Sequence, residues 1–108
     1  MPRRRAEPTD GEDTPSWTFL TNHGHVLVCI ANNPQVLVSE IADAVGIRER
    51  AAHRIVGDLV DAGYVVRRKE GRRNTYSVNL DLPMRHAQEA DHSVGEFLRV
   101  LAGRRRRA

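Results

Sequence analysis

The sequence predicts a small, mainly α-helical domain with one β-hairpin, which is an α+β fold. Apolar residues recur at spacings of three and four in several segments, as is typical of amphipathic helices. Two runs rich in β-branched and aromatic residues, 64–68 and 75–78, flank a segment with glycine and asparagine, which is typical of a hairpin. The length of 108 residues fits a single domain.

Both ends of the chain are predicted to stay outside this domain. Residues 1–16 contain three prolines and no aromatic residue. Such a segment buries too little apolar surface to offset the entropy that ordering costs. We therefore expect a disordered tail at 1–16, a folded domain at 17–80, a C-terminal helical segment at 81–103 and a basic disordered tail at 104–108.

The first predicted helix covers roughly residues 23–31, with Asn22 as its N-cap. Pro34 ends this helix, because the residue before a proline is pushed out of the helical region. Residues 36–38 form a short run with two valines, which predicts one short edge strand.

Two further helices are expected on either side of a glycine turn. Ser39 is a favourable N-cap for a short helix at 40–45, which Gly46 ends. A longer helix follows at 49–62, and Gly63 closes it. The residues of this longer helix that are expected to face the core are Ala52, Ile55, Val56, Leu59 and Val60.

The hairpin and a last helix complete the predicted order. The connection at 69–74 is rich in cations, so the hairpin has a basic tip. Pro83 then breaks the chain, and residues 86–102 predict one amphipathic helix. Its expected apolar stripe consists of Ala87, Ala90, Val94, Phe97, Leu98 and Leu101.

Positive charge is concentrated in one part of the domain. The net charge of +3 comes from the two ends, because residues 17–103 hold ten basic and ten acidic side chains. Within that range, residues 48–73 hold eight cations and four anions. A local excess of positive charge is what binding to a nucleic acid requires. An ordinary solvent-exposed face would also carry such charges, so both interpretations stay open.

The segment from Val38 to Leu59 indicates a particular motif. Two helices that cross through a tight turn need small residues where they touch, and Ala42 and Ala52 meet this need. The stretch SEIADAVGIRERAAHRIV resembles a helix-turn-helix, and the basic hairpin resembles the wing of winged-helix regulators. The order of elements over residues 17–101 is similar to the MarR and ArsR families of bacterial transcription regulators.

This resemblance implies a winged helix-turn-helix protein that binds double-stranded DNA, more often as a repressor than as an activator. The second helix of the motif would enter the major groove, and the wing would contact the backbone or the minor groove. Arg50 and Arg54 are one helical turn apart, so either could pair bidentately with a guanine. The expected DNA-contacting residues are Ser39, Arg48, Glu49, Arg50, His53, Arg54, Lys69, Arg72 and Arg73.

Arg48 departs from the usual pattern of the motif. The position before the second helix usually carries Ser or Thr, whereas an arginine side chain cannot cap and its charge opposes the helix dipole. We expect this choice to cost about 1 kcal/mol. A contact from Arg48 to a phosphate or a base would explain it.

The apolar stripe of the last helix is expected to need a cover, because a winged-helix core closes by about Val78. Pairing with the same helix of a second copy would give a two-fold homodimer, with close backbone approach at Gly95. The alternative is that this helix folds back on its own domain against Trp17 and Phe19. The expected interface residues are Ala90, Val94, Phe97, Leu98 and Leu101.

Other chemistries have less support from the sequence. His23, His25 and Cys29, or His86, Asp91 and His92, are close enough along the chain to be weighed as metal ligands. A cysteine in an apolar helix is more often a small buried residue, so we expect no metal, no cofactor and no catalytic residue. The alternatives left open are a protein-interaction module and a ligand- or metal-responsive sensor of the same fold.

The compartment follows from three absences in the sequence. The single cysteine excludes an internal disulfide. The sequence contains no apolar run long enough for a membrane span and no signal-peptide pattern, so we expect a cytoplasmic protein.

Overall fold

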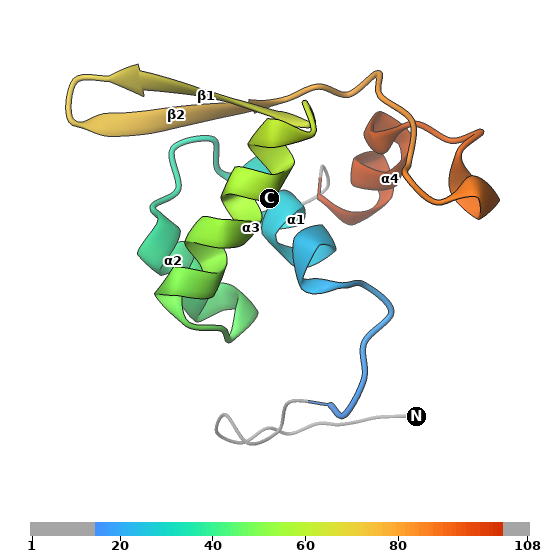
Figure 1. Cartoon of the computed structure of the whole chain (residues 1–108), viewed down its shortest axis with the longest axis horizontal. Coiled ribbons are helices and arrows are strands. Elements are labelled where there is room, and N and C mark those ends of the chain that lie inside the picture. Colours follow the sequence, from blue (N-terminus) through green and yellow to red (C-terminus); the bar gives the residue numbers. More distant parts are fainter. Residues whose placement is uncertain (1–14, 103–108) are drawn as a thin grey trace.

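The computed structural model describes residues 15–102, so most of the predicted tail at 1–16 and all of the predicted tail at 104–108 lie outside the described residues (Figure 1). The predicted fold class is confirmed, since the described part is mainly α-helical with one antiparallel hairpin. In chain order the elements are α1 (Asn22–Asn32), α2 (Val38–Val45), α3 (Glu49–Asp61), β1 (Val65–Glu70), β2 (Arg73–Val78), the 3-10 turn η2 (Ala87–Glu89) and α4 (Val94–Leu101).

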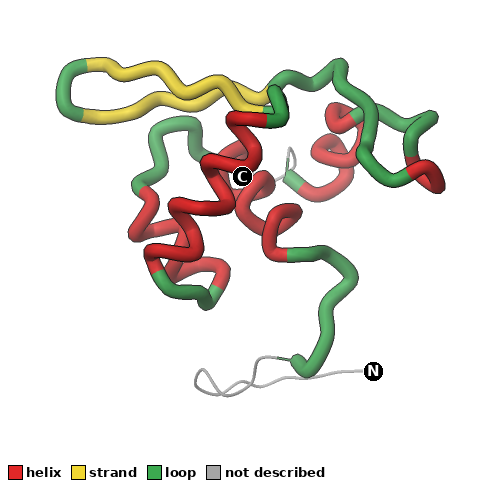
Figure 2. Tube along the Cα trace, viewed as in Figure 1, coloured by secondary structure: helices red, strands yellow, loops and turns green. Residues whose placement is uncertain are grey.

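The helices α1, α2 and α3 pack against one another, and the hairpin extends away from them (Figure 2). Every helix from α1 to α4 and both strands contribute buried apolar side chains, so one core joins all these elements. The largest side chains that are fully buried are Val26, Ile30, Ile41, Val56 and Val65. The hairpin is therefore anchored at its base, while its tip projects into solvent.

Helix α1 begins one position earlier than the sequence predicts. The N-cap is Thr21 rather than Asn22, because the Thr21 Oγ1 accepts a hydrogen bond of 3.2 Å from the Gly24 N–H. The helix ends before Pro34, where Asn33 takes an extended conformation.

The prediction of a short strand at residues 36–38 is wrong. Val36 is buried in the connection between α1 and α2, and Val38 is already the first residue of α2. The neighbouring segment does meet the sheet, since the Tyr76 N–H donates to the Pro34 carbonyl at 2.8 Å. One such hydrogen bond ties the loop to β2 without making a third strand among the described residues.

The prediction of Ser39 as the N-cap of α2 is also wrong. Leu37 holds the cap position, and its backbone N–H donates to the Glu40 Oε1 at 2.9 Å. This carboxylate accepts from the cap residue itself, while the leucine side chain offers no acceptor to the N–H groups of the first turn. Ser39 lies in the first turn of α2 and is exposed.

The turn between α2 and α3 agrees with the prediction. Gly46 ends α2 with a φ of 85°, a left-handed conformation that favours glycine. Ala42 and Ala52 are both buried, as expected for two helices that cross closely. The extent of α3 differs from the prediction by one residue at its end.

The hairpin is longer and its turn tighter than predicted. The strands pair up to Glu70 and Arg73, which leaves Gly71 and Arg72 as the two turn residues. Gly71 has a φ of 66° and Arg72 does not share this positive φ, which is the pattern of a type II′ turn. The register therefore sets Val65 opposite Val78 and Lys69 opposite Asn74.

The prediction of a single helix at 86–102 is wrong, because the chain forms η2 and then starts the separate helix α4. Ser93 caps α4: its Oγ accepts from the Glu96 N–H at 3.1 Å, and the Glu96 Oε1 accepts from the Ser93 N–H at 2.9 Å. The Ser93 N–H, together with His92, holds the pKa of Glu96 below its usual value. Ala90 consequently lies outside α4 and is exposed.

Helix α4 packs on α1 of its own chain. Its buried residues Val94 and Leu98 belong to the common core, so these two side chains are already covered within one chain. Gly95 approaches Leu80 of the same chain, with its N–H donating to the Leu80 carbonyl at 2.9 Å. The Tyr64 hydroxyl donates to the Pro83 carbonyl and joins the end of α3 to this C-terminal segment.

Two glycines test this packing. An added Cβ at Gly57 in α3 would meet nothing within 4 Å, so Gly57→Ala should raise the free energy of unfolding by about 0.5–1 kcal/mol through helix propensity. An added Cβ at Gly95 would lie 3.0 Å from the Leu80 carbonyl oxygen, so Gly95→Ala should lower it by about 1 kcal/mol. Urea denaturation measures both. Equal stabilisation by the two substitutions would contradict the packing of α4.

Candidate nucleic-acid interface

Helix α3 presents a polar face opposite its buried one. Ala52, Ile55, Val56 and Leu59 are buried against the rest of the domain. Packing of these residues fixes the rotation of the helix about its axis, and the other side must face solvent. The side chains exposed there are the predicted contact residues Glu49, Arg50, His53 and Arg54.

The cations of α3 and the wing have no acidic partners in the described chain. Each ion pair within 4.0 Å among residues 15–102 involves a histidine rather than an arginine or lysine. The exposed cations concerned are Arg48, Arg50, Arg54, Arg67, Arg68, Lys69, Arg72 and Arg73. Their charges are thus not neutralised by neighbouring carboxylates of residues 15–102, and they remain available to an anion such as a phosphate group.

The register of the hairpin distributes its cations over both faces and the tip. Directly opposed residues share a face, so Arg67 and Lys69 lie on the face of the buried Tyr76. Arg68 lies on the other face. Arg72 occupies the turn, at the far end from the core. Arg67 and Arg68 contribute to the predicted local excess of charge but were not predicted as contact residues, although strand alternation exposes one on each face.

Arg73 has a structural partner as well. Its Nη2 donates to the Gln35 carbonyl at 3.1 Å. Together with the hydrogen bond from Tyr76 to Pro34, this contact holds the first part of β2 against the loop between α1 and α2. Arg73 is thus partly engaged, whereas Lys69 and Arg72 make no side-chain hydrogen bond to a described residue.

The N-terminus of α3 carries the unusual cap that the sequence predicts. Arg48 has the extended backbone of an N-cap residue, with φ −74° and ψ 152°, but makes no side-chain capping hydrogen bond. Glu49 follows as the first helical residue, and its Oε2 lies 3.7 Å from the His53 Nε2. The start of α3 therefore combines a free cation, free backbone N–H groups and one carboxylate.

The other end of α3 is joined to α1 by a side-chain hydrogen bond that the sequence did not predict. The His23 Nε2 and the Asp58 Oδ2 are 2.8 Å apart, although 35 positions separate the two residues. No local spacing signals such a pair. It leaves Asp58 engaged at the end of the helix away from Arg48.

The residues weighed as metal ligands do not form a metal site in the described part of the chain. Among residues 15–102, no group of three or more His, Cys, Asp or Glu side chains is placed to hold a metal ion. Burial raises the pKa of the Cys29 thiol, which lowers its reactivity at neutral pH. No helix in the described part of the chain is both long and apolar enough to cross a membrane.

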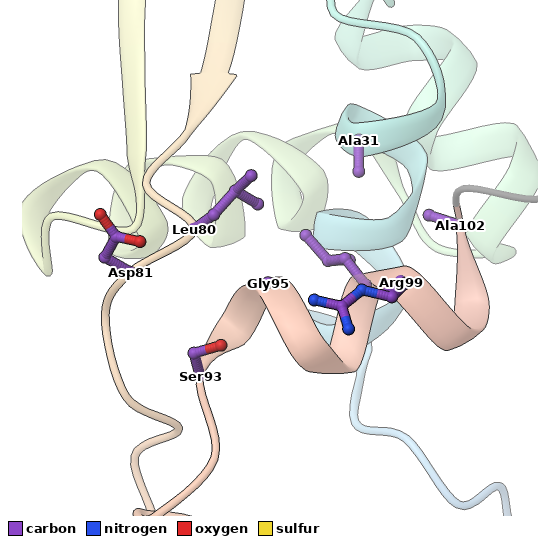
Figure 3. Close-up of a pocket in the computed structure, with 8 residues that line it drawn as sticks. Ala31, Leu80, Asp81, Ser93, Gly95, Arg99 and Ala102 are labelled. Carbon is purple, nitrogen blue, oxygen red and sulfur yellow. The ribbon is translucent and has the colours of Figure 1, made fainter.

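A hollow of about 690 Å³ lies at the C-terminal end of α3, lined by residues that include His23, Asp58 and Asp61, and two others lie beside the C-terminal segment. One of about 500 Å³ lies between α1, α4 and residues 80–81, with Arg99 extending along α4 (Figure 3). Another of about 480 Å³ is more apolar and is lined by residues that include Phe19, Leu27, Leu59, Met84 and Phe97. The exposed cations of α3 and the wing line none of these hollows.

The two crossing helices α2 and α3, followed by a projecting basic hairpin, define a winged helix-turn-helix protein. The model of the MarR family matches residues 18–73, which is more than half of the chain. The chain belongs to the MarR family, whose members are generally DNA-binding transcription regulators rather than enzymes. The match spans α1 to the start of β2 and leaves out α4. The search of curated proteins found no match.

The uncapped start of α3 leads to a stability prediction. Arg48→Ser supplies a hydroxyl that accepts from a backbone N–H of the first turn, so it should raise the free energy of unfolding by about 1 kcal/mol. Ser39→Ala is the control, because Ser39 is exposed and is not a cap; its effect should stay within about 0.5 kcal/mol. Thermal and urea unfolding measure both. If Ser39→Ala lowered the free energy of unfolding by about 1 kcal/mol, the cap of α2 would be misassigned.

Proposed function

We propose that this protein is a sequence-specific regulator of transcription that binds double-stranded DNA as a homodimer. Helix α3 would enter the major groove, and the wing would contact the backbone or the minor groove. One observation carries this proposal: the cations on α3 and on the wing are exposed and have no acidic partners in the described chain. We also propose that the protein acts in the cytoplasm, where bacterial chromosomal DNA lies.

The chemistry of α3 supports base contacts. Arg50 and Arg54 are one turn apart on the exposed face, and a guanidinium group can donate two parallel hydrogen bonds to the O6 and N7 of guanine. His53 lies between them in sequence and can donate or accept. These side chains would determine sequence preference, while Arg48 at the cap would meet a phosphate.

The wing and α2 would supply contacts that position the protein. Lys69, Arg72 and Arg73, with the additional cations Arg67 and Arg68, would bind phosphates or enter the minor groove. Ser39 lies in the first turn of α2, where free backbone N–H groups favour a phosphate oxygen. Such contacts raise affinity for all sequences and make it depend on salt.

The homodimer rests on two supports. Regulators of the MarR family typically act as dimers. Trp17 and Phe19 form an edge-to-face pair with ring centroids 5.1 Å apart, yet they are 68% and 92% exposed. Large exposed apolar side chains of this kind are typical of interfaces. We propose that Trp17 and Phe19, with Leu101 and the accessible part of Phe97, pack against a second copy.

This surface differs from the stripe expected from the sequence, because Val94 and Leu98 face the core and Ala90 lies outside α4. A two-fold dimer would place two α3 helices on half-sites about 34 Å apart. We further propose repression as the mode of action, since a dimer bound across a promoter excludes other proteins by occupancy alone.

The DNA-binding surface can be tested by substitution and salt titration. Wild-type affinity should fall with salt, with a log–log slope of about −0.9 for each neutralised phosphate. Arg54→Ala should cost about 1–3 kcal/mol on the preferred sequence and flatten sequence preference. Arg72→Ala should weaken all sequences alike and reduce the slope by about 1. Fluorescence anisotropy on selected and scrambled duplexes measures these quantities.

Arg99→Ala is the matched control, since Arg99 is an exposed arginine on α4, outside the helix-turn-helix and the wing. It should change neither affinity nor slope. If Arg54→Ala and Arg72→Ala behave like this control, the protein is instead an interaction module that uses the same fold without specific DNA binding.

The proposed dimer surface predicts how a substitution within it changes the molecular mass of the protein in solution. Phe19→Asp places a charge on a fully exposed part of the surface, so it should yield a folded monomer at concentrations where the wild type is a dimer. Val66→Asp is the control, because Val66 is an exposed apolar residue on the wing and should leave the dimer intact. Light scattering with circular dichroism gives mass and folding. A Phe19→Asp dimer would exclude this surface as the interface.

A further inference from the structure

We propose that Glu49 is a specificity-determining residue of α3, which selects a base with an exocyclic amino group in the major groove. This inference rests on the proposed function and goes further, since it assigns base selection to an acidic residue within a basic surface. The bases concerned are cytosine, through N4, and adenine, through N6.

The geometry keeps the Glu49 carboxylate available. Glu49 is the first residue of α3, and its side chain is 59% exposed. It stands between Arg48 and Arg50 in sequence but lies within 4.0 Å of neither guanidinium group. Its Oε2 is 3.7 Å from the His53 Nε2, and the carboxylate accepts no hydrogen bond from a described residue.

The other acids of this region are engaged or lie elsewhere. Asp58 pairs with His23 near the opposite end of α3. Glu70 accepts a hydrogen bond of 3.2 Å from the Thr75 hydroxyl on the wing. Asp61 is the last residue of α3. Glu49 is therefore the acid placed among the cations that would approach the groove.

A carboxylate at this point favours few partners. Phosphates repel it, and ionised carboxylates only accept hydrogen bonds. In the major groove, guanine offers the acceptors N7 and O6, and thymine offers the acceptor O4 and a methyl group. The amino groups of cytosine and adenine donate, so only these two bases compensate for the desolvation of the carboxylate. Every base pair presents one such amino group in the major groove, so Glu49 would penalise the pairs that place it on the strand that the carboxylate does not reach.

His53 is the neighbour of the Glu49 carboxylate on α3. It lies one turn further along α3 and faces one carboxylate oxygen, which leaves the other oxygen for the base. Glu49 and His53 are both exposed, so their relative position does not depend on packing of their side chains in the core.

The experiment uses Glu49→Ala and Glu49→Gln in the full chain, with Asp58→Ala as the matched acid on the same helix. Sequences bound by each protein are selected from a random duplex pool, and affinities are measured on the preferred and on a scrambled duplex. Urea unfolding shows that each variant is folded.

We expect wild-type protein to require cytosine or adenine at one position of each half-site. Glu49→Ala should remove that requirement and tighten binding to scrambled DNA, so that the ratio of specific to scrambled affinity falls by at least about fivefold. Glu49→Gln should select adenine, because an amide pairs bidentately with its N6 and N7. A change from cytosine to adenine identifies cytosine as the wild-type base, whereas retained adenine identifies adenine. Asp58→Ala should keep the wild-type preference.

Two outcomes would overturn the inference, and they are distinguishable. If wild-type protein selects a sequence and Glu49→Ala keeps every base preference and the same affinity ratio, Glu49 has no role in specificity while the proposed function stands. If wild-type protein selects no sequence and its binding does not depend on salt, the proposed function fails and this inference fails with it.

Discussion

The burial of one side of α3 is the constraint on which the rest of the structure depends. Ile55 and Val56 pack into the core between α1, α2 and the base of the hairpin, where they are almost inaccessible to solvent. Because a helix is rigid about its own axis, this packing alone decides which residues point outward. The polar face of α3 is therefore set by apolar contacts, and no interaction between its charged side chains is needed to orient it.

A second set of contacts fixes the wing relative to that face. Two hydrogen bonds connect β2 with the loop before α2, one from the Tyr76 backbone and one from the Arg73 side chain. The Tyr64 hydroxyl adds a link from the end of α3 to the segment before α4. The helix-turn-helix, the wing and the C-terminal segment are thus held as one unit, which suits a surface that must match the repeat of a duplex.

Local patterns were sufficient for several features that local chemistry determines. The periodicity of α3, the glycine at the α2–α3 turn and the unusual cap at Arg48 were all predictable. Two other local features were missed, although each rests on a hydrogen bond between residues three positions apart. Ser39 lost the cap position because Glu40 reaches back to Leu37, and the last helix begins at Val94 because Ser93 and Glu96 cap each other there. The pairing of His23 with Asp58 and the exposure of Trp17 and Phe19 follow only from the packed chain.

The two-residue turn at Gly71 and Arg72 constrains how the length of the wing can change in evolution. Side chains alternate between the faces of a strand, so the insertion of one residue into one strand would move the cations beyond it to the opposite side. A change that adds one residue to each strand keeps the pairing register but still moves the cations beyond it to the opposite face, whereas two residues added to each strand restore every face. We expect diverging relatives that keep the same contacts to differ in wing length by multiples of four residues, with two residues added or removed in each strand.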